Sequence, residues 1–324
     1  MKKLLKLVLF LLLLGVIISL FFANCEGKGD VKTDGSSFTF LVAGYDNAAE
    51  NTDVLFLMSY EKNTNEISVI QIPRDSFVEY RGSYGKINRI YSSERASGKS
   101  GGDALTALQH AVEDYLGINI NASVALSLDA FMRFIDNFDG VTVNVPENVR
   151  LDNMPVKLSY GVNTISAKDA LKLVRERKNY PNGDLGRLDV QKIVLDGIFH
   201  TAFEKIDTKM IAKLIFTRDD EVFFDANLFE ISGFLIREYG DIKNAGITLL
   251  TLPGEALEYE GVSYYVVNKA AAKNAVLRYI GGENFDKEFK LTDRNNALIN
   301  SLYEKKVLSY KVYSYGKLID INVS

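Results

Sequence analysis

The fold is decided by residues 38–75, FTFLVAGYDNAAENTDVLFLMSYEKNTNEISVIQIPRD. This stretch contains three short runs of apolar, β-branched and aromatic residues, at 38–45, 54–60 and 67–72, separated by pieces rich in turn residues. Runs of this kind are typical of β-strands. The polar piece at 61–65 has the length of a hairpin connection, so it is predicted to join the second strand to the third.

Further along the chain, helical and strand patterns alternate. Helices are predicted at 103–116, 129–138, 166–177, 187–206, 226–239 and 269–280, and strands at 124–128, 141–145, 247–252 and 264–267. Asp103 is the predicted N-cap of the first helix and Gly117 its stop. Because nothing repeats and no linker divides the body, we predict a single α/β domain with a central mixed β-sheet and helices on both faces.

Composition narrows the function classes. The chain has 324 residues, of which 38 are basic and 42 acidic, so its net charge is −4. This balance argues against a nucleic-acid partner held by diffuse positive charge. One Cys excludes an internal disulfide and a thiolate zinc site, and two His leave little for a histidine metal cage. A metal ion would therefore be held by oxygen ligands.

The N-terminal region predicts attachment to a membrane. Residues 7–23 are an uncharged run rich in Leu and Phe, close to the minimum of about 17 residues that spans a bilayer, and three Lys precede it. This pattern favours a cytoplasmic tail at 1–6, one transmembrane anchor at 7–24 and a linker at 25–36, with the body outside the cell. A cleaved signal peptide and lipidation of Cys25 are alternatives that place the body on the same side.

Four charged residues lie where predicted strands begin or end. Asp46 and Asp53 flank the first strand connection, and such a pair can converge on one hard cation such as Mg²⁺. Pro73 cannot donate to a sheet ladder, so the third strand should end there and present Arg74 and Asp75 at its carboxyl end, where open α/β sheets carry their sites. Turn formation by the first pair and a surface ion pair in the second are the structural alternatives.

A second group of basic residues surrounds the loop near residue 181. Arg175 and Arg177 precede the loop, while Arg187 and Gln191 are predicted to open the next helix on one face, where backbone N–H groups also favour an anion. Three guanidinium groups around one point would suit a pyrophosphate. Alternatively, Asp184 is only an N-cap and the Arg residues are solvated.

The ordered series of these pieces resembles the LytR-CpsA-Psr family, the cell-wall glycopolymer ligases of Gram-positive bacteria. The resemblance covers roughly 38–206, and a weaker similarity is found at 252–254 and 263–265. It implies an extracellular catalytic domain over 37–285 on a single-pass protein of the cell membrane. Residues 286–324 form a C-terminal extension without a family interpretation. The pieces that carry the resemblance are Gly44-Tyr45-Asp46, Thr52-Asp53, Ile72-Pro73-Arg74-Asp75, Lys86-Ile87-Asn88, Asp139-Gly140-Val141, Ala170-Leu171, Arg175-Glu176-Arg177, Gly183-Asp184-Leu185-Gly186-Arg187 and Gln191.

The resemblance also implies an activity. A teichoic acid or capsule polymer would move from a polyprenyl-pyrophosphate carrier to a muramic-acid hydroxyl of peptidoglycan, with an apolar tunnel for the lipid; candidate tunnel walls are 124–128, 131–138 and 193–199. By matching position, Asp46 and Asp53 would hold Mg²⁺ or Mn²⁺. The residues that would grip the pyrophosphate are Arg74, Lys86, Arg175, Arg177, Arg187 and Gln191. The chain departs from the family pattern at Asn51 and Val54.

Phosphoryl transfer also needs a general base. Asp75 and Asp184 are the candidates, and Asp184 is preferred because it adjoins the Arg cluster. Two other functions stay open on the same residues: hydrolysis, as a polyprenyl-pyrophosphate phosphatase, and a membrane scaffold or sensor that binds lipid-linked precursors without turnover.

Overall fold

The computed structural model describes residues 37–152, 154–175, 180, 183–205, 221–225, 238, 240–242, 244–280, 297–314 and 317–323, with the backbone alone at 183–185 and 203. The predicted tail, anchor and linker, Cys25, Arg177 and most of the helix predicted at 226–239 lie outside these residues. Within the described ranges, no helix combines the length and apolar character needed to cross a membrane.

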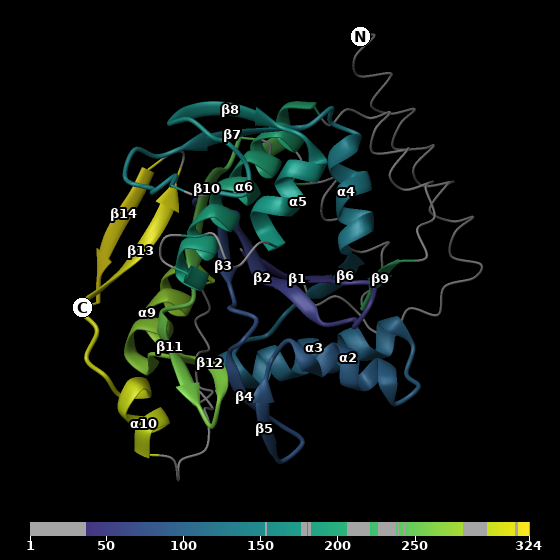
Figure 1. The fold of residues 1–324 in the computed structure, drawn as a ribbon, viewed down its shortest axis with the longest axis vertical. Coiled ribbons are helices and arrows are strands. Elements are labelled where there is room, and N and C mark those ends of the chain that lie inside the picture. Colours follow the sequence, from purple (N-terminus) through teal and green to yellow (C-terminus); the bar gives the residue numbers. More distant parts are fainter. Residues whose placement is uncertain are drawn as a thin grey trace.

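The centre of the fold is an eight-stranded sheet in the order β14-β13-β10-β3-β2-β1-β6-β9 (Figure 1). Strand β1 runs parallel to β6, and β3 runs parallel to β10, whereas the other neighbours are antiparallel. The mixed sheet predicted from the sequence is therefore confirmed. Its strands are β1 (Ser37–Tyr45), β2 (Thr52–Glu61), β3 (Glu66–Gln71), β6 (Ala122–Ser127), β9 (Val222–Phe224), β10 (Gly246–Thr251), β13 (Ser309–Ser314) and β14 (Lys317–Asn322).

Within the described ranges, three two-stranded hairpins lie outside the central sheet. They are β4 (Phe77–Tyr80) with β5 (Ser83–Lys86), β7 (Val141–Val145) with β8 (Gly161–Ile165), and β11 (Gly254–Tyr259) with β12 (Val262–Val267). The strand predicted at 141–145 thus forms, but in a hairpin.

Helices cover both faces of the sheet, as predicted (Figure 1). Alternate strand residues feed two apolar cores: Leu41 and Leu57 point into the first, and Phe56 and Val69 into the second. Helices α2 (Arg89–Ala96), α3 (Gly101–Leu116), α9 (Lys269–Tyr279) and α10 (Ala297–Tyr303) contribute to the first core, while α4 (Leu128–Asp136), α5 (Ala167–Arg175) and α6 (Gly183–Lys205) contribute to the second.

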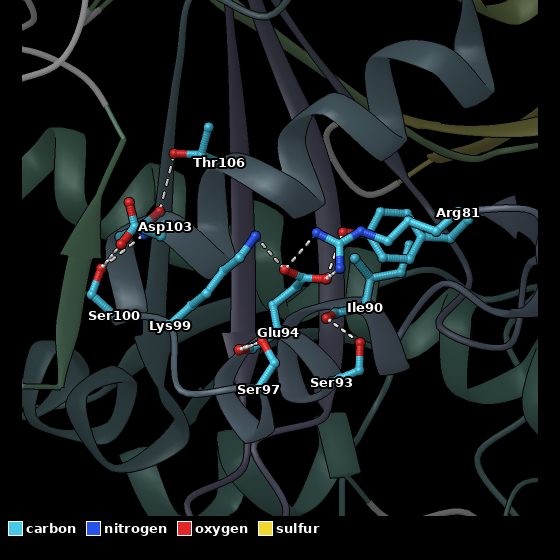
Figure 2. Close-up of polar contacts among 11 residues, drawn as sticks. Arg81, Ile90, Ser93, Glu94, Ser97, Lys99, Ser100, Asp103 and Thr106 are labelled. Atoms are coloured by element: carbon cyan, nitrogen blue, oxygen red, sulfur yellow. Dashed lines mark hydrogen bonds and ion pairs between the residues drawn. The ribbon is translucent and has the colours of Figure 1, made fainter.

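Two helix starts differ from their predictions. The N-cap of α3 is Ser100, whose hydroxyl accepts a hydrogen bond from the Asp103 amide at 3.1 Å, so Asp103 lies in the first turn (Figure 2). The C-cap of this helix is Gly117, at a φ of +66°, as predicted. Helix α6 begins at Gly183, so Arg187 sits one turn inside it, and the prediction that Arg187 and Gln191 open the helix is wrong.

The C-terminal residues belong to the same body. Strand β13 pairs with β10, and β14 pairs with β13, so both extend the central sheet at one edge (Figure 1). The extension, to which the sequence assigned no structure, therefore adds two strands to the sheet that carries the site.

Candidate functional site

A polar cavity of about 360 Å³ lies where the carboxyl ends of β1 and β3 meet the start of β2. Strands β1 and β3 both run antiparallel to β2, so their carboxyl ends reach the same edge of the sheet. Every described residue that lines the cavity is polar or charged. They are Asp46, Asn51, Asp53, Arg74, Asp75, Lys86, Asn88, Arg89 and Arg175.

Asp46 enters the cavity because it closes the turn after β1. Its Oδ1 accepts hydrogen bonds from the amides of Ala48 and Ala49 at 2.9 and 3.0 Å, and its own amide donates to the Asn51 carbonyl at 3.1 Å. An aspartate whose carboxylate accepts hydrogen bonds from amides two and three residues ahead stabilises a tight turn. The compact loop therefore brings Asp46 and Asp53 to one cavity.

Arg74 links the charged groups at the centre of the site. Its side chain is only 8% exposed and pairs with Asp53 through Nη1. Asp75 lies between two cations: its Oδ1 is 3.9 Å from Arg74 Nε and 3.0 Å from Lys86 Nζ. Arg74 Nε is buried without a hydrogen-bond partner among the residues that the structure describes. A buried donor in this state calls for an explanation, and an anionic ligand in the cavity would supply the acceptor.

Lys86 lines the cavity from the end of β5 in the β4–β5 hairpin, and Arg89 lines it from the start of α2. Backbone hydrogen bonds fix this segment against the end of β3: the Asn88 amide donates to the Arg74 carbonyl at 3.2 Å, and the Ile87 amide to the Ser76 carbonyl at 2.9 Å. Lys86 and Arg89 are thus held beside Arg74 by main-chain contacts.

Glu94, on α2, fastens the far end of the same hairpin (Figure 2). Its side chain is 2% exposed, and it accepts from Tyr80 Oη at 2.8 Å, pairs with Arg81 Nη1 at 2.9 Å and with Lys99 Nζ at 2.5 Å. Burial by itself would raise the pKa of Glu94, but the hydrogen bonds from Lys99 and Tyr80 and the Lys99 and Arg81 charges hold that pKa below its ordinary value. The ionised carboxylate therefore ties hairpin, helix and following loop together.

Arg175, at the end of α5, lines the cavity from the opposite face of the sheet. Gln191, 2% exposed on α6, donates through Nε2 to the Val174 carbonyl at 2.6 Å and accepts from the Gln71 side chain. It joins α5, α6 and β3 behind the cavity, next to Arg175. Arg187 is equally buried, at 2% exposure.

The structure brings six of the predicted site residues to one cavity. These are Asp46, Asp53, Arg74, Asp75, Lys86 and Arg175. Arg187 and Gln191 do not line it, Arg177 lies outside the described residues, and the Asp184 side chain is not described.

Three lining residues received no role from the sequence. Asn88 belongs to the piece Lys86-Ile87-Asn88, and Arg89 follows it directly. Their nearness to Lys86 was the signal in the sequence that could have indicated both as site residues. Asn51 was noted only as a departure from the family pattern. With Arg89 included, four cations and three carboxylates among the described residues line the cavity.

The donor set fits a divalent ion that shares its coordination with a phosphate. Among the residues described, no three His, Cys, Asp or Glu side chains are grouped closely enough to hold a metal by themselves. Mg²⁺ in phosphate-handling sites usually takes one or two carboxylates and completes its shell with phosphate oxygens and water. Asp46 and Asp53, on the wall of one cavity, meet that requirement.

The predicted tunnel walls lie mainly in or against the second core. Ile135, Ile193 and Ile198 are buried there, and Phe131 and Phe199 pack against it while partly exposed. These positions are those of ordinary core residues, and a lipid tunnel stays a prediction.

Comparison with known proteins finds a matching family model and several relatives. The sequence model of the LytR_cpsA_psr family matches residues 23–278. The chain is 27% identical over 218 residues to the polyisoprenyl-teichoic acid–peptidoglycan teichoic acid transferase TagU of Oceanobacillus iheyensis, covering 67% of this chain and 66% of the relative. It is 30% identical over 168 residues to TagU of Bacillus subtilis, covering 50% and 51%. The matches thus span about half to two thirds of these relatives.

Solved structures show the same fold. The LytR-CPS2A-psr family protein YwtF (TagT), solved with bound octaprenyl pyrophosphate lipid, superposes with a TM-score of 0.57 at 21% identity. The superposition covers 80% of this chain and 95% of that chain. At this level of identity the likeness establishes the architecture of the sheet and its helices.

Proposed function

Because the chain belongs to the LytR-CpsA-Psr family, whose sequence model matches residues 23–278, we propose that it transfers a cell-wall glycopolymer from a polyprenyl-pyrophosphate carrier to peptidoglycan. The observation that carries the proposal is the convergence of four cations and three carboxylates, counted over the described residues, on one polar cavity at the carboxyl edge of the sheet. The names of the relatives favour a teichoic acid polymer, with a capsule polymer as the alternative.

In this proposal the diphosphate of the carrier lies in the cavity. Arg74, Lys86, Arg89 and Arg175 are placed to bind its oxygens, and Arg groups suit this task because each guanidinium can donate two hydrogen bonds in one plane. Bound Mg²⁺, held by Asp46 and Asp53, would neutralise further negative charge on the phosphates. Positive groups that stabilise charge on the equatorial oxygens are the main catalytic requirement of phosphoryl transfer.

The reaction exchanges one phosphorus–oxygen bond for another. The acceptor hydroxyl oxygen attacks the phosphorus that bears the glycopolymer, and a new phosphodiester forms. The bond from that phosphorus to the bridging oxygen breaks, and polyprenyl phosphate leaves with the electron pair. The hydroxyl proton passes to a general base of the protein.

Asp75 and Asp184 are the two candidates for that base. The Asp75 carboxylate lines the cavity, but it also pairs with Lys86 at 3.0 Å, which favours a role in orienting the lysine. Asp184 stays our preference because it adjoins the predicted Arg cluster along the chain. If D184N retains full transfer with an unchanged pH profile while D75N shifts that profile, the assignment passes to Asp75.

One assay separates the three proposed activities. The full-length protein is supplied with lipid-linked donor and Mg²⁺, with and without peptidoglycan. A ligase leaves covalent polymer on the wall material and releases polyprenyl phosphate only with acceptor present. A phosphatase releases it in both reactions, and a scaffold binds the donor without releasing it. Covalent polymer on the wall is the outcome we expect.

The location of the body is a separate proposal. We infer an anchor at 7–24 and an extracellular domain from the uncharged run and the lysines before it. Protease added to intact protoplasts should then degrade the body, and its full protection would contradict this topology.

A further inference from the structure

An aromatic surface borders the cavity on the hairpin side. It consists of Phe77, Tyr84 and Tyr264, and we call it the aromatic shelf. The Phe77 and Tyr84 rings stack, with centroids 5.6 Å apart and planes 6° from parallel, and the Tyr264 ring meets Phe77 edge-on at 5.0 Å. Phe77 is 5% exposed and forms the base, whereas Tyr84 is 43% exposed. An exposed tyrosine is therefore held flat by a buried ring.

Strand register sets the shelf beside the cavity. In the hairpin, Phe77 faces Lys86 and Glu79 faces Tyr84, so Tyr84 and Lys86 lie on one face of β5, roughly 7 Å apart along the strand. Lys86 Nζ lies 5.7 Å from the Tyr264 ring centroid and 3.0 Å from Asp75 Oδ1. Lys86 consequently belongs to the cavity and to the edge of the shelf at once.

The shelf is fixed in place at both ends. Glu94 binds Tyr80 and Arg81 at the turn of the hairpin (Figure 2). On the other side, the Tyr265 amide donates to the Asp75 carbonyl at 2.8 Å, which fixes the strand that carries Tyr264. A rigid aromatic surface loses little conformational entropy when a ligand covers it.

We propose that the aromatic shelf is a subsite for a pyranose ring of the glycan that enters or leaves the reaction. This subsite rests on the proposed transferase function. One face of a pyranose presents polarised C–H groups, which pack on the electron-rich face of an aromatic ring. Glu79, exposed and opposite Tyr84 on the same face of the hairpin, is placed to accept hydrogen bonds from sugar hydroxyls. A diphosphate held by Lys86 would put its attached or incoming sugar next to Tyr84.

The chain contains no Trp, which gives the proposal a direct optical test. Y84W introduces a single indole on the shelf, and Y160W places one at another exposed tyrosine, 53% exposed and outside the hairpin, as the matched control. Two soluble probes are titrated: tetra-N-acetylchitotetraose, which represents the wall glycan, and a short-chain prenyl-pyrophosphate disaccharide, which represents the donor. We expect a saturable emission change in Y84W with one of them, and none in Y160W.

The optical result decides between the occupants. If neither sugar probe changes the Y84W emission, the subsite does not exist. If anionic phospholipid vesicles change it and the sugars do not, the shelf is a membrane contact and the proposal is overturned. A response to the chitotetraose assigns the acceptor, and a response to the disaccharide alone assigns the donor.

Kinetics supply a second test with its own controls. Y84A should raise the KM of one sugar substrate about tenfold, the upper range for one aromatic contact, while kcat changes less than threefold. Y84F keeps the ring, so its KM should stay close to that of the wild type, whereas the KM of Y84L should be raised as in Y84A. Equal KM values in all three variants would overturn the subsite. Because the optical titration needs no turnover, a failure of transfer and a failure of the subsite are distinguishable.

Discussion

The Glu94 cluster and the polar cavity are both built from ion pairs, but the first holds structural elements together and the second surrounds an open volume. Around Glu94, the donors of Tyr80, Arg81 and Lys99 converge on one carboxylate, which is 2% exposed (Figure 2). Around the cavity, four cations and three carboxylates enclose about 360 Å³, and a buried guanidinium nitrogen keeps an unused donor among the described residues. Around Glu94 three donors converge on one buried carboxylate, which makes a structural tie. Around the cavity, Arg74 and Lys86 pair with Asp53 and Asp75 but also border open volume, which is the arrangement expected of a binding site.

The largest effect is expected from R74A. It removes the cation at the centre of the cavity and leaves Asp53 without this partner. Transfer should fall about 10³-fold, because one preorganised charge at a transition state is worth several kcal/mol. The control is R150A, whose side chain is 65% exposed and, in the described part of the chain, pairs with exposed Asp152. Comparable losses in both variants, measured as kcat/KM for release of polyprenyl phosphate, would break the contrast between cavity and surface.

The second effect concerns stability. E94Q should lower the free energy of unfolding by about 2 kcal/mol, since it discharges a buried partner of two cations that can still reach water. Urea unfolding measures this value. The matched control is E79Q, an exposed glutamate on the hairpin that Glu94 binds, and it should change stability by less than about 0.5 kcal/mol. An equal loss in E79Q would contradict a special role for Glu94.

The pH dependence of that loss follows from the depressed pKa of Glu94. A carboxylate with a lowered folded-state pKa stabilises the protein above its unfolded pKa of about 4.3, and this contribution disappears as pH falls through the folded value. The stability difference between wild type and E94Q should therefore be full above about pH 5 and shrink in more acid solution. A difference that stays constant from pH 6 to pH 3 would rule out the charge as its source.

A third, smaller effect is expected at the metal ligands. D46N and D53N should each raise the Mg²⁺ concentration for half-maximal transfer at least tenfold, because each removes one of two carboxylates. Mn²⁺ binding in the presence of a soluble diphosphate, followed by electron paramagnetic resonance, gives the same comparison without turnover. Asp152→Asn, far more exposed at 71%, serves as the control. Unaltered Mn²⁺ binding in both ligand variants would exclude the proposed metal site.

The smallest effect should come from R89A. Arg89 lines the cavity but is exposed, so its charge is screened by water far more than that of Arg74. We expect the KM for donor to rise about fivefold with little change in kcat. A loss of kcat/KM in R89A as large as that in R74A would show that the burial of a cation does not determine its contribution to transfer.

Local patterns predicted the parts of the site that sit at strand ends. The alternation of residues 38–72 predicts the strands, and Asp46, Asp53, Arg74 and Asp75 follow from where those strands stop. Long-range pairing was beyond such patterns: β10 joins β3 from some 180 residues away, as Gly246 opposite Glu66 shows. The sequence could not predict those partners because no local spacing records which distant strand supplies the ladder.

Other misses have local causes. Ser100 and Asp103 both suit an N-cap, and only the backbone geometry selects Ser100. Hairpin β4–β5 has four-residue strands with Gly82 and Gly85 within or beside them, too short and too Gly-rich to register as strands, and so Arg89 beside it was missed. Arg187 was misplaced because helix boundaries are the least certain feature of a pattern, and a shift of one turn removes it from the N-terminus.

The central claim is that the polar cavity binds the diphosphate. A crystal structure of the protein with geranyl pyrophosphate and Mg²⁺ tests this most directly. We predict diphosphate oxygens within hydrogen-bond distance of Arg74 and Lys86, and a metal between those oxygens and Asp46 or Asp53. A diphosphate ordered elsewhere on the protein, with water alone between Arg74 and Lys86, would contradict the account.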